Sequence, residues 1–123
     1  MFWKLLLRRI KSFGYAWNGI LFLFKTQPNF IIHSMVMILV LLAGWFFRIN
    51  ANEWLACFIC FGLMLSAEAI NTALEELVNL VEPNFNPKAG IVKDVAAAAV
   101  LFAALCCIIV GLFIFLPKIL LLF

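Results

Sequence analysis

The 123-residue sequence is 67% hydrophobic and 12% charged, and it carries a formal net charge of +3. Its apolar fraction is far above the roughly 45–50% typical of globular domains, which excludes an ordinary water-soluble protein. Anionic lipid headgroups can accommodate the positive charge, and the chain holds no motif for reading bases, which excludes a nucleic-acid-binding protein. We therefore predict one all-α integral membrane domain over residues 1–123.

The first predicted element is an amphipathic helix over residues 1–26. Its basic residues Lys4, Arg8 and Lys11 recur at helical spacing among apolar and aromatic side chains. A helix with this pattern lies in the membrane surface, with its basic face toward the headgroups. We therefore expect a surface helix before the first membrane span.

Three later segments are long and apolar enough to cross a bilayer, which takes about 20 residues. We predict transmembrane helices over residues 29–48, 53–82 and 94–118, the second of which extends beyond the membrane. Pro28 precedes the first span and suits the first turn of a helix. Residues 83–93 are expected to form the loop between the second and third spans.

The basic residues indicate how these spans are oriented. Most of them fall on the side of the N-terminus and the 83–93 loop, and few fall on the other side. By the positive-inside rule, we expect the N-terminus and this loop to face the cytoplasm. The residues on the cytoplasmic side are Lys4, Arg8, Arg9, Lys11, Lys25, Lys88 and Lys93, against Arg48 and Lys118 on the other.

The cysteines and the single histidine are interpreted as packing residues. Cys57 and Cys60 form a CxxC pattern inside an apolar span, without a second pair or a histidine at zinc-ligand spacing. Cys106 and Cys107 are neighbours within another span. His33 has no second histidine to join it in a metal site, so we expect it to make a polar contact at the membrane interface or between helices.

A polar stripe at the inner end of the second span is the most informative feature. Glu68, Asn71 and Glu75 stand at i, i+3 and i+7, on one face of a helix. A carboxylate within a bilayer costs about 2.5–3.5 kcal/mol on insertion scales, and such residues are usually functional. Glu68 suits a general base for a lipid hydroxyl, and Glu75 suits a cation ligand near cytoplasmic phosphates. Lys93 and Asp94 stand just before the third span, where a basic side chain and a helix N-terminus favour phosphate.

These residues belong to two motifs that carry a family resemblance. The run EAINTALE at residues 68–75, followed by KDVAAAAV at residues 93–100, resembles the signature of the bacterial diacylglycerol kinase and undecaprenol kinase family. The similarity covers nearly the whole chain. It includes Arg8, Lys11, Gly14, Tyr15, Trp17 and Gly19 in the first helix, and the run IFLPK at residues 114–118.

The resemblance implies an ATP-dependent, magnesium-requiring lipid kinase in the bacterial plasma membrane. It implies a helical-bundle homotrimer, with three spanning helices and one surface helix per subunit and with composite active sites facing the cytoplasm. Glu68 would be the general base, Asn71 would orient that face and Glu75 would bind magnesium. The resemblance also implies a nucleotide site formed by Arg8, Tyr15, Gln27, Glu75, Asn84, Phe85, Asn86, Lys93 and Asp94.

The sequence departs from the family pattern at three positions. Gln27 stands where the family has a second metal-binding glutamate, and its neutral amide oxygen should hold magnesium more weakly. Gln27 is either a natural variant or an introduced substitution, and weakened activity is expected in both cases. Asn79 stands where aspartate is usual, and Ala98 replaces a glycine of the alanine-rich motif. No conventional P-loop is present, because Ile20 stands where that motif requires lysine after Gly19.

Two functions remain open at this level. The first is phosphorylation of a lipid alcohol, and the segments around Lys25 and Pro117 resemble the undecaprenol kinases, so undecaprenol is preferred over diacylglycerol. The alternative is a non-catalytic oligomeric membrane protein, such as a pore or an assembly subunit, in which Glu68 and Asn71 only join helices. Nucleotide dependence distinguishes the two. A lipid phosphatase is disfavoured, because no serine, histidine and acid are arranged as a nucleophile.

Overall fold

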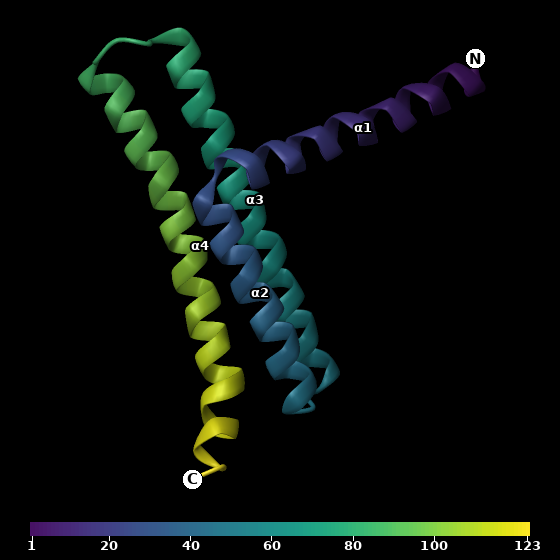
Figure 1. Ribbon diagram of the computed structural model, residues 1–123, viewed down its shortest axis with the longest axis vertical. Coiled ribbons are helices and arrows are strands. Elements are labelled where there is room, and N and C mark those ends of the chain that lie inside the picture. The colour runs from purple at the N-terminus through teal and green to yellow at the C-terminus, as the bar shows by residue number, and fades with distance from the viewer.

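The computed structural model describes residues 1–123 as four α-helices without strands. They are α1 over Phe2–Thr26, α2 over Pro28–Phe46, α3 over Ala51–Val81 and α4 over Pro87–Leu120. Figure 1 shows α2, α3 and α4 side by side in a bundle, while α1 projects sideways from the start of α2. The predicted all-α membrane architecture is confirmed, including a separate N-terminal helix.

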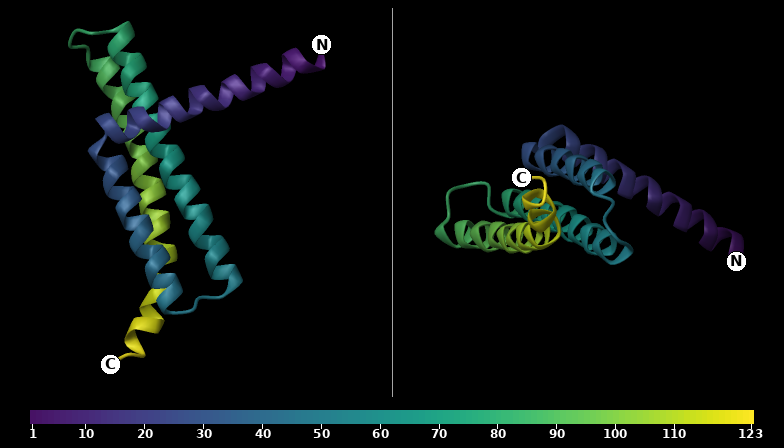
Figure 2. Two further views of the ribbon diagram at one scale, coloured as in Figure 1. Left: turned by 45° about the vertical axis from the view of Figure 1, so that its right-hand side comes forward. Right: turned by 90° about the horizontal axis from the view of Figure 1, so that it is seen from below.

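The three bundle helices are the membrane spans. Helices α2, α3 and α4 contain 19, 31 and 34 residues, with mean hydropathies of 2.0, 1.6 and 3.1 in their most apolar windows. A helix rises 1.5 Å per residue, so about 20 residues cross the hydrocarbon core. Helices α3 and α4 are therefore longer than one crossing requires. Figure 2 shows their joined ends extending past the level at which α1 leaves the bundle.

Local capping determines where two of these helices begin. Pro28 occupies the first turn of α2, where its missing N–H leaves no intrahelical hydrogen bond unmade. Helix α3 begins with a capping box: the Asn50 side chain accepts from the Glu53 N–H at 3.0 Å, and Glu53 Oε2 accepts from the Asn50 N–H at 2.9 Å. Lys118 of α4 donates to Glu53 Oε1 at 2.7 Å, which ties the two helices together at this end.

The loop between α3 and α4 is shorter than the predicted span of residues 83–93. Helix α4 begins at Pro87, because the Asn86 side chain caps it by accepting from the Lys88 N–H at 2.9 Å. Lys93 and Asp94 consequently lie inside the helix and not just before it. At its other end α4 passes through Pro117 and continues to Leu120.

Packing within the chain is concentrated between α3 and α4. Helix α2 packs on α3 over a smaller area, and α1 contacts α2 near their junction. Where α2 ends and α3 begins, Gly44 lets α2 approach Trp54 closely, since an added Cβ would lie 2.7 Å from the indole ring. Only 11 of 123 residues are buried, so the spans present most of their apolar side chains to the surroundings.

Candidate functional site

The polar face of α3 consists of the three residues that the sequence singled out, Glu68, Asn71 and Glu75, together with Thr72. Glu68 and Thr72 are both only 3% exposed, and Asn71 and Glu75 are partly buried. The Asn71 side-chain amide donates to Glu75 Oε1 at 3.3 Å. The two motif residues are therefore joined by a hydrogen bond along one helix face, and Glu68 stands at the more deeply buried end of that face.

Helix α2 supplies the group that approaches Glu68. His33 Nε2 lies 3.1 Å from Glu68 Oε1, and the two side chains are 28% and 4% exposed. The imidazole N–H is not aimed along this approach, so Glu68 Oε1 makes no formed hydrogen bond. The sequence predicted only a polar contact for His33, and the structure shows that this contact is made between helices. Its partner could not be named from the sequence, because the contact joins residues 35 positions apart.

Three buried polar atoms on this face have no hydrogen-bond partner within the chain. They are Glu68 Oε1, Asn71 Oδ1 and Thr72 Oγ1, all within little more than one helical turn. A buried polar atom left without a partner costs about 1–3 kcal/mol, and such atoms are uncommon in native proteins. This concentration marks the face as one that a ligand, an ion or another chain completes. Thr72 was not predicted as a site residue, although its place beside Asn71 in the same motif was available as a signal.

A groove runs beside this face between α3 and α4. Its volume is about 480 Å³, and its lining includes Asn71, Ala67, Ala96, Ala99 and Ala103. Small side chains of this kind let a further helix approach closely within a membrane. Asn71 and Ser66 are the two polar residues in an otherwise apolar lining, and Asn71 Oδ1 is itself buried.

A second cavity of about 410 Å³ lies among α2, α3 and α4. Its lining is almost entirely apolar and includes Met37, Cys57, Cys107 and Phe115, with His33 as the single ionisable side chain other than cysteine. All four cysteines of the chain are free thiols: Cys57 is buried, Cys60 and Cys107 are half-buried, and Cys106 is exposed in the single chain.

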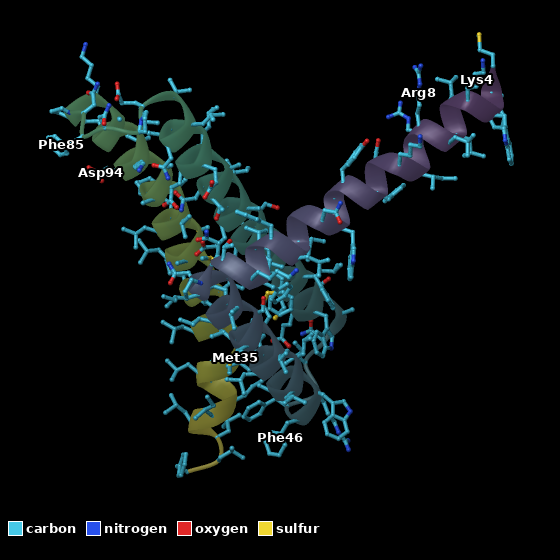
Figure 3. The ribbon with its side chains drawn as sticks, turned by 45° about the horizontal axis from the view of Figure 1, so that its top comes forward. Lys4, Arg8, Met35, Phe46, Phe85 and Asp94 are labelled. Atoms are coloured by element: carbon cyan, nitrogen blue, oxygen red, sulfur yellow. The ribbon has the colours of Figure 1, made fainter.

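The loop residues and Lys93 meet at the cytoplasmic end proposed for the α3–α4 pair. Lys93 Nζ donates to Asn79 Oδ1 at 2.6 Å. The neutral Asn79 amide does not offset the positive charge of Lys93, but this hydrogen bond holds the lysine side chain in place. A cavity of about 220 Å³ is formed here by both residues together with the turn, and its lining includes Glu82, Asn84, Phe85 and Asn86. Figure 3 shows Phe85 and Asp94 near this end of the molecule.

The residues of α1 are not brought to the rest of the predicted site within one chain. Arg8 is exposed near the far end of α1, and in Figure 3 it lies well away from Phe85 and Asp94. Tyr15 is 73% exposed. The side chain of Gln27, at the junction of α1 and α2, makes one hydrogen bond within the chain, in which Nε2 donates to Thr26 Oγ1 at 3.4 Å. No hydrogen bond or ion pair joins α1 to α3 or α4.

The donor set on α3 fits a magnesium ion that also binds phosphates. Mg²⁺ takes oxygen ligands and is commonly held by one or two carboxylates, with water and substrate phosphates filling its other positions. Glu75 offers a carboxylate, and Asn71 Oδ1 beside it is one of the buried atoms without a partner. The chain contains no cluster of three acidic, histidine or cysteine side chains that would hold an ion alone. The residues therefore fit an ion that arrives with a phosphate ligand.

Comparison with known proteins identifies the family. Residues 14–115 match the family model described as prokaryotic diacylglycerol kinase. The undecaprenol kinase of Bacillus subtilis is 42% identical over 112 residues, which cover 90% of each chain. The diacylglycerol kinase of Synechocystis is 37% identical over 119 residues, covering 96% of this chain and 68% of its own. The diacylglycerol kinase of Escherichia coli K12 is 24% identical over 102 residues, covering 83% and 84%. The chain therefore belongs to the prokaryotic diacylglycerol kinase family of membrane-bound lipid kinases.

Proposed function

We propose that the protein transfers the γ-phosphate of ATP, bound with Mg²⁺, to the terminal hydroxyl of a membrane lipid alcohol. Undecaprenol is the preferred acceptor and diacylglycerol the second choice. The similarity to an undecaprenol kinase at 42% identity supports this order, as do the resemblances noted around Lys25 and Pro117. Relatives named as diacylglycerol kinases keep the second acceptor in view.

The observation that carries the proposal is the arrangement of carboxylates on α3. Glu68 is almost fully buried, and seven residues further along the same helix Glu75 is held by Asn71. Seven residues correspond to about 10 Å along a helix axis. That spacing leaves room for an acceptor hydroxyl beside Glu68 and for the terminal phosphate between the two carboxylates.

Each polar residue then has a distinct task. Glu68 accepts the proton of the lipid hydroxyl as that oxygen attacks the γ-phosphorus, while the bond from phosphorus to the β–γ bridging oxygen breaks and ADP leaves. Glu75 holds the bound cation, and the Asn71 amide keeps the Glu75 carboxylate in place. When present, Mg²⁺ would neutralise charge on the phosphate oxygens and so favour attack by an oxygen nucleophile. Positioning and charge neutralisation supply most of the rate in phosphoryl transfer.

The nucleotide is proposed to lie toward the turn between α3 and α4. Lys93 and Asp94 contribute from α4, and the turn residues Asn84, Phe85 and Asn86 contribute from its rim. Lys93 donates to Asn79 in the structure, so nucleotide binding would require its ammonium group to exchange that amide for a phosphate oxygen. The exchange replaces a neutral amide acceptor with an anionic phosphate oxygen, so the ammonium group gains a Coulombic attraction that the amide does not supply.

Arg8, Tyr15 and Gln27 complete the site in a homotrimer. Within one chain α1 packs mainly on α2, and no hydrogen bond or ion pair joins it to the polar groups on α3. The broad apolar surface of the spans and the alanine-lined groove both suit association with further copies. A site shared between subunits would therefore reconcile the position of α1 with the roles that the family resemblance implies for its residues.

The active site is proposed to face the cytoplasm of a bacterial inner membrane. The distribution of basic residues favours this orientation. The end of the α3–α4 pair that would reach the cytoplasm carries charged residues, including Glu75, Glu82, Lys88 and Lys93. ATP is available on that side of the membrane, and the lipid hydroxyl lies at the adjacent interface.

The test is transfer of labelled γ-phosphate from magnesium ATP to undecaprenol and to diacylglycerol in detergent micelles. Phosphorylated lipid is expected, with faster transfer to undecaprenol. The chain is assayed as it stands and as Gln27→Glu, because product that forms only with the glutamate would show a correct site that binds magnesium poorly. No product from either form, with the protein folded and oligomeric, would refute the kinase proposal and favour a purely structural role for the polar face.

A further inference from the structure

The contact between His33 and Glu68 gives the buried carboxylate a partner that the proposed mechanism has not used. Nε2 lies 3.1 Å from Oε1. The chain has only one other ion-pair contact, between Lys118 and Glu53 at the opposite end of α3. No lysine or arginine lies within ion-pair distance of Glu68, so the imidazole is the only basic group beside it.

Packing holds His33 in place. Helix α2 begins at Pro28, and in its first turn the Phe30 side chain is 4% exposed and packs edge-on against Phe24 of α1 at 4.9 Å between ring centroids. Ser34, next to the histidine, donates to the Phe30 carbonyl at 2.8 Å. The imidazole therefore extends from an anchored helical turn toward α3.

Two of the other polar groups near this face are hydrogen-bonded elsewhere, whereas Thr72 Oγ1, one turn from Glu68 on α3, has no partner. Asn71 donates to Glu75, and Lys93 of α4 donates to Asn79. The residues of α4 that line the adjacent groove are small or apolar, and Cys106 is the only titratable one among them. On its other side His33 borders an apolar cavity, whose side chains offer its N–H only the weakly accepting sulfur atoms of cysteine and methionine.

We propose that His33 is a positioning residue for Glu68. In the working enzyme the ring turns about its Cβ–Cγ bond, a broad and soft torsion, and donates Nε2–H to Glu68 Oε1. That bond leaves Oε2 free and directed at the lipid hydroxyl whose proton it receives. A glutamate has three rotatable side-chain bonds, and holding its carboxylate in one orientation raises the fraction of encounters in which proton transfer is possible. The inference rests on the proposed role of Glu68 as general base.

The kinetic test compares two substitutions of His33 in the full-length protein in detergent micelles. His33→Leu fills similar space but has no donor, so kcat should fall about 10- to 100-fold, as expected for loss of a hydrogen bond to a charged group. His33→Gln retains an N–H donor at a similar reach and should keep kcat within about threefold of the parent. The KM for magnesium ATP should change less than about twofold in both, because His33 is not placed at the nucleotide.

Two kinetic results would overturn the proposal. One is an undiminished kcat in His33→Leu. The other is an equal loss in His33→Leu and His33→Gln when both have the oligomeric state and unfolding temperature of the parent, which would make the residue a packing element only.

A spectroscopic test is independent of turnover and of the proposed reaction. The chain has a single histidine, so labelling with ¹⁵N-histidine yields one imidazole signal set. Glu68→Gln should shift these ¹⁵N resonances, because it changes the charge of the group 3.1 Å away. Glu76→Gln, an exposed carboxylate two turns along the same helix, should leave them in place. Unchanged imidazole ¹⁵N resonances in Glu68→Gln would show that His33 and Glu68 are not in contact. A parent protein without kinase activity, but with this shift, would refute the proposed function and leave the contact standing.

Discussion

Helices α1 and α3 differ in the burial and the contacts of their polar residues. On α3 the motif residues are buried or half-buried, and they contact one another or a neighbouring helix, as in the Asn71–Glu75 bond and the approach of His33 to Glu68. On α1 the residues implied by the same family resemblance, Arg8 and Tyr15, are exposed and reach no other helix. The α3 part of the proposed site is thus organised within one chain, whereas the proposed contribution of α1 requires another copy of the chain.

The largest expected effect comes from Glu68. Glu68→Gln removes the proposed general base while keeping the side chain's shape, and kcat should fall about 10²- to 10⁴-fold. The measurement is labelled phosphate transfer from magnesium ATP to undecaprenol. Glu76→Gln is the matched control, since it removes an exposed carboxylate from the same helix and should leave kcat within about twofold. If both substitutions reduced kcat equally, the buried end of α3 would not be the reactive one.

The next effect concerns magnesium and links the two regions, because Gln27 lies where α1 meets α2. Gln27→Glu adds a carboxylate where the family has a second metal-binding glutamate. It should lower the magnesium concentration for half-maximal activity about tenfold, an effect of about 1.4 kcal/mol. Chelation of the metal should stop transfer in both forms. Thr26→Glu adds the same charge one residue away and should change the magnesium requirement much less.

A smaller effect is expected on α1. Arg8→Ala should raise the KM for ATP about threefold to tenfold, as a phosphate contact is lost at a site that solvent partly screens. The unfolding temperature should stay unchanged, because the exposed Arg8 side chain makes no hydrogen bond or ion pair within the chain. An unchanged KM would show that α1 takes no part in nucleotide binding and that the α3–α4 end suffices.

The smallest effect on turnover is expected from a glycine that concerns packing alone. Gly44→Ala places a Cβ 2.7 Å from the Trp54 ring and should destabilise the fold by about 1–3 kcal/mol, without changing kcat per folded protein by more than about twofold. Gly19→Ala on α1 meets nothing within 4 Å in the single chain and should not destabilise it. Thermal unfolding in mild detergent measures both. A large loss from Gly19→Ala would indicate that another copy packs against α1.

Much of the fold could be predicted from the sequence, because spanning helices depend on local hydropathy. Runs of about 20 apolar residues must be helical in a bilayer, where every backbone group needs an internal partner. The end of the loop before α4 was harder to predict. Its position depends on one hydrogen bond, in which the Asn86 side-chain oxygen accepts from the Lys88 N–H and so caps the helix.

The polar face of α3 likewise has features that the sequence predicts and features that it does not. That Glu68, Asn71 and Glu75 share one helix face follows from their spacing alone, and their catalytic roles stay a prediction. The partners of these residues on other helices do not follow from that spacing. His33 meets Glu68, and Lys93 meets Asn79, only because α2 and α4 pack against α3 at particular heights and rotations.

The sequence by itself determined the number of helices, their membrane character and the face on which the carboxylates stand, because each follows from residues within a few turns of one another. The tertiary structure alone decided that a histidine lies against the buried Glu68, that Lys93 donates to the Asn79 amide, and that α1 projects away from the polar face of α3. Those outcomes depend on contacts between segments distant in the chain, whose geometry is set by packing and not by local pattern.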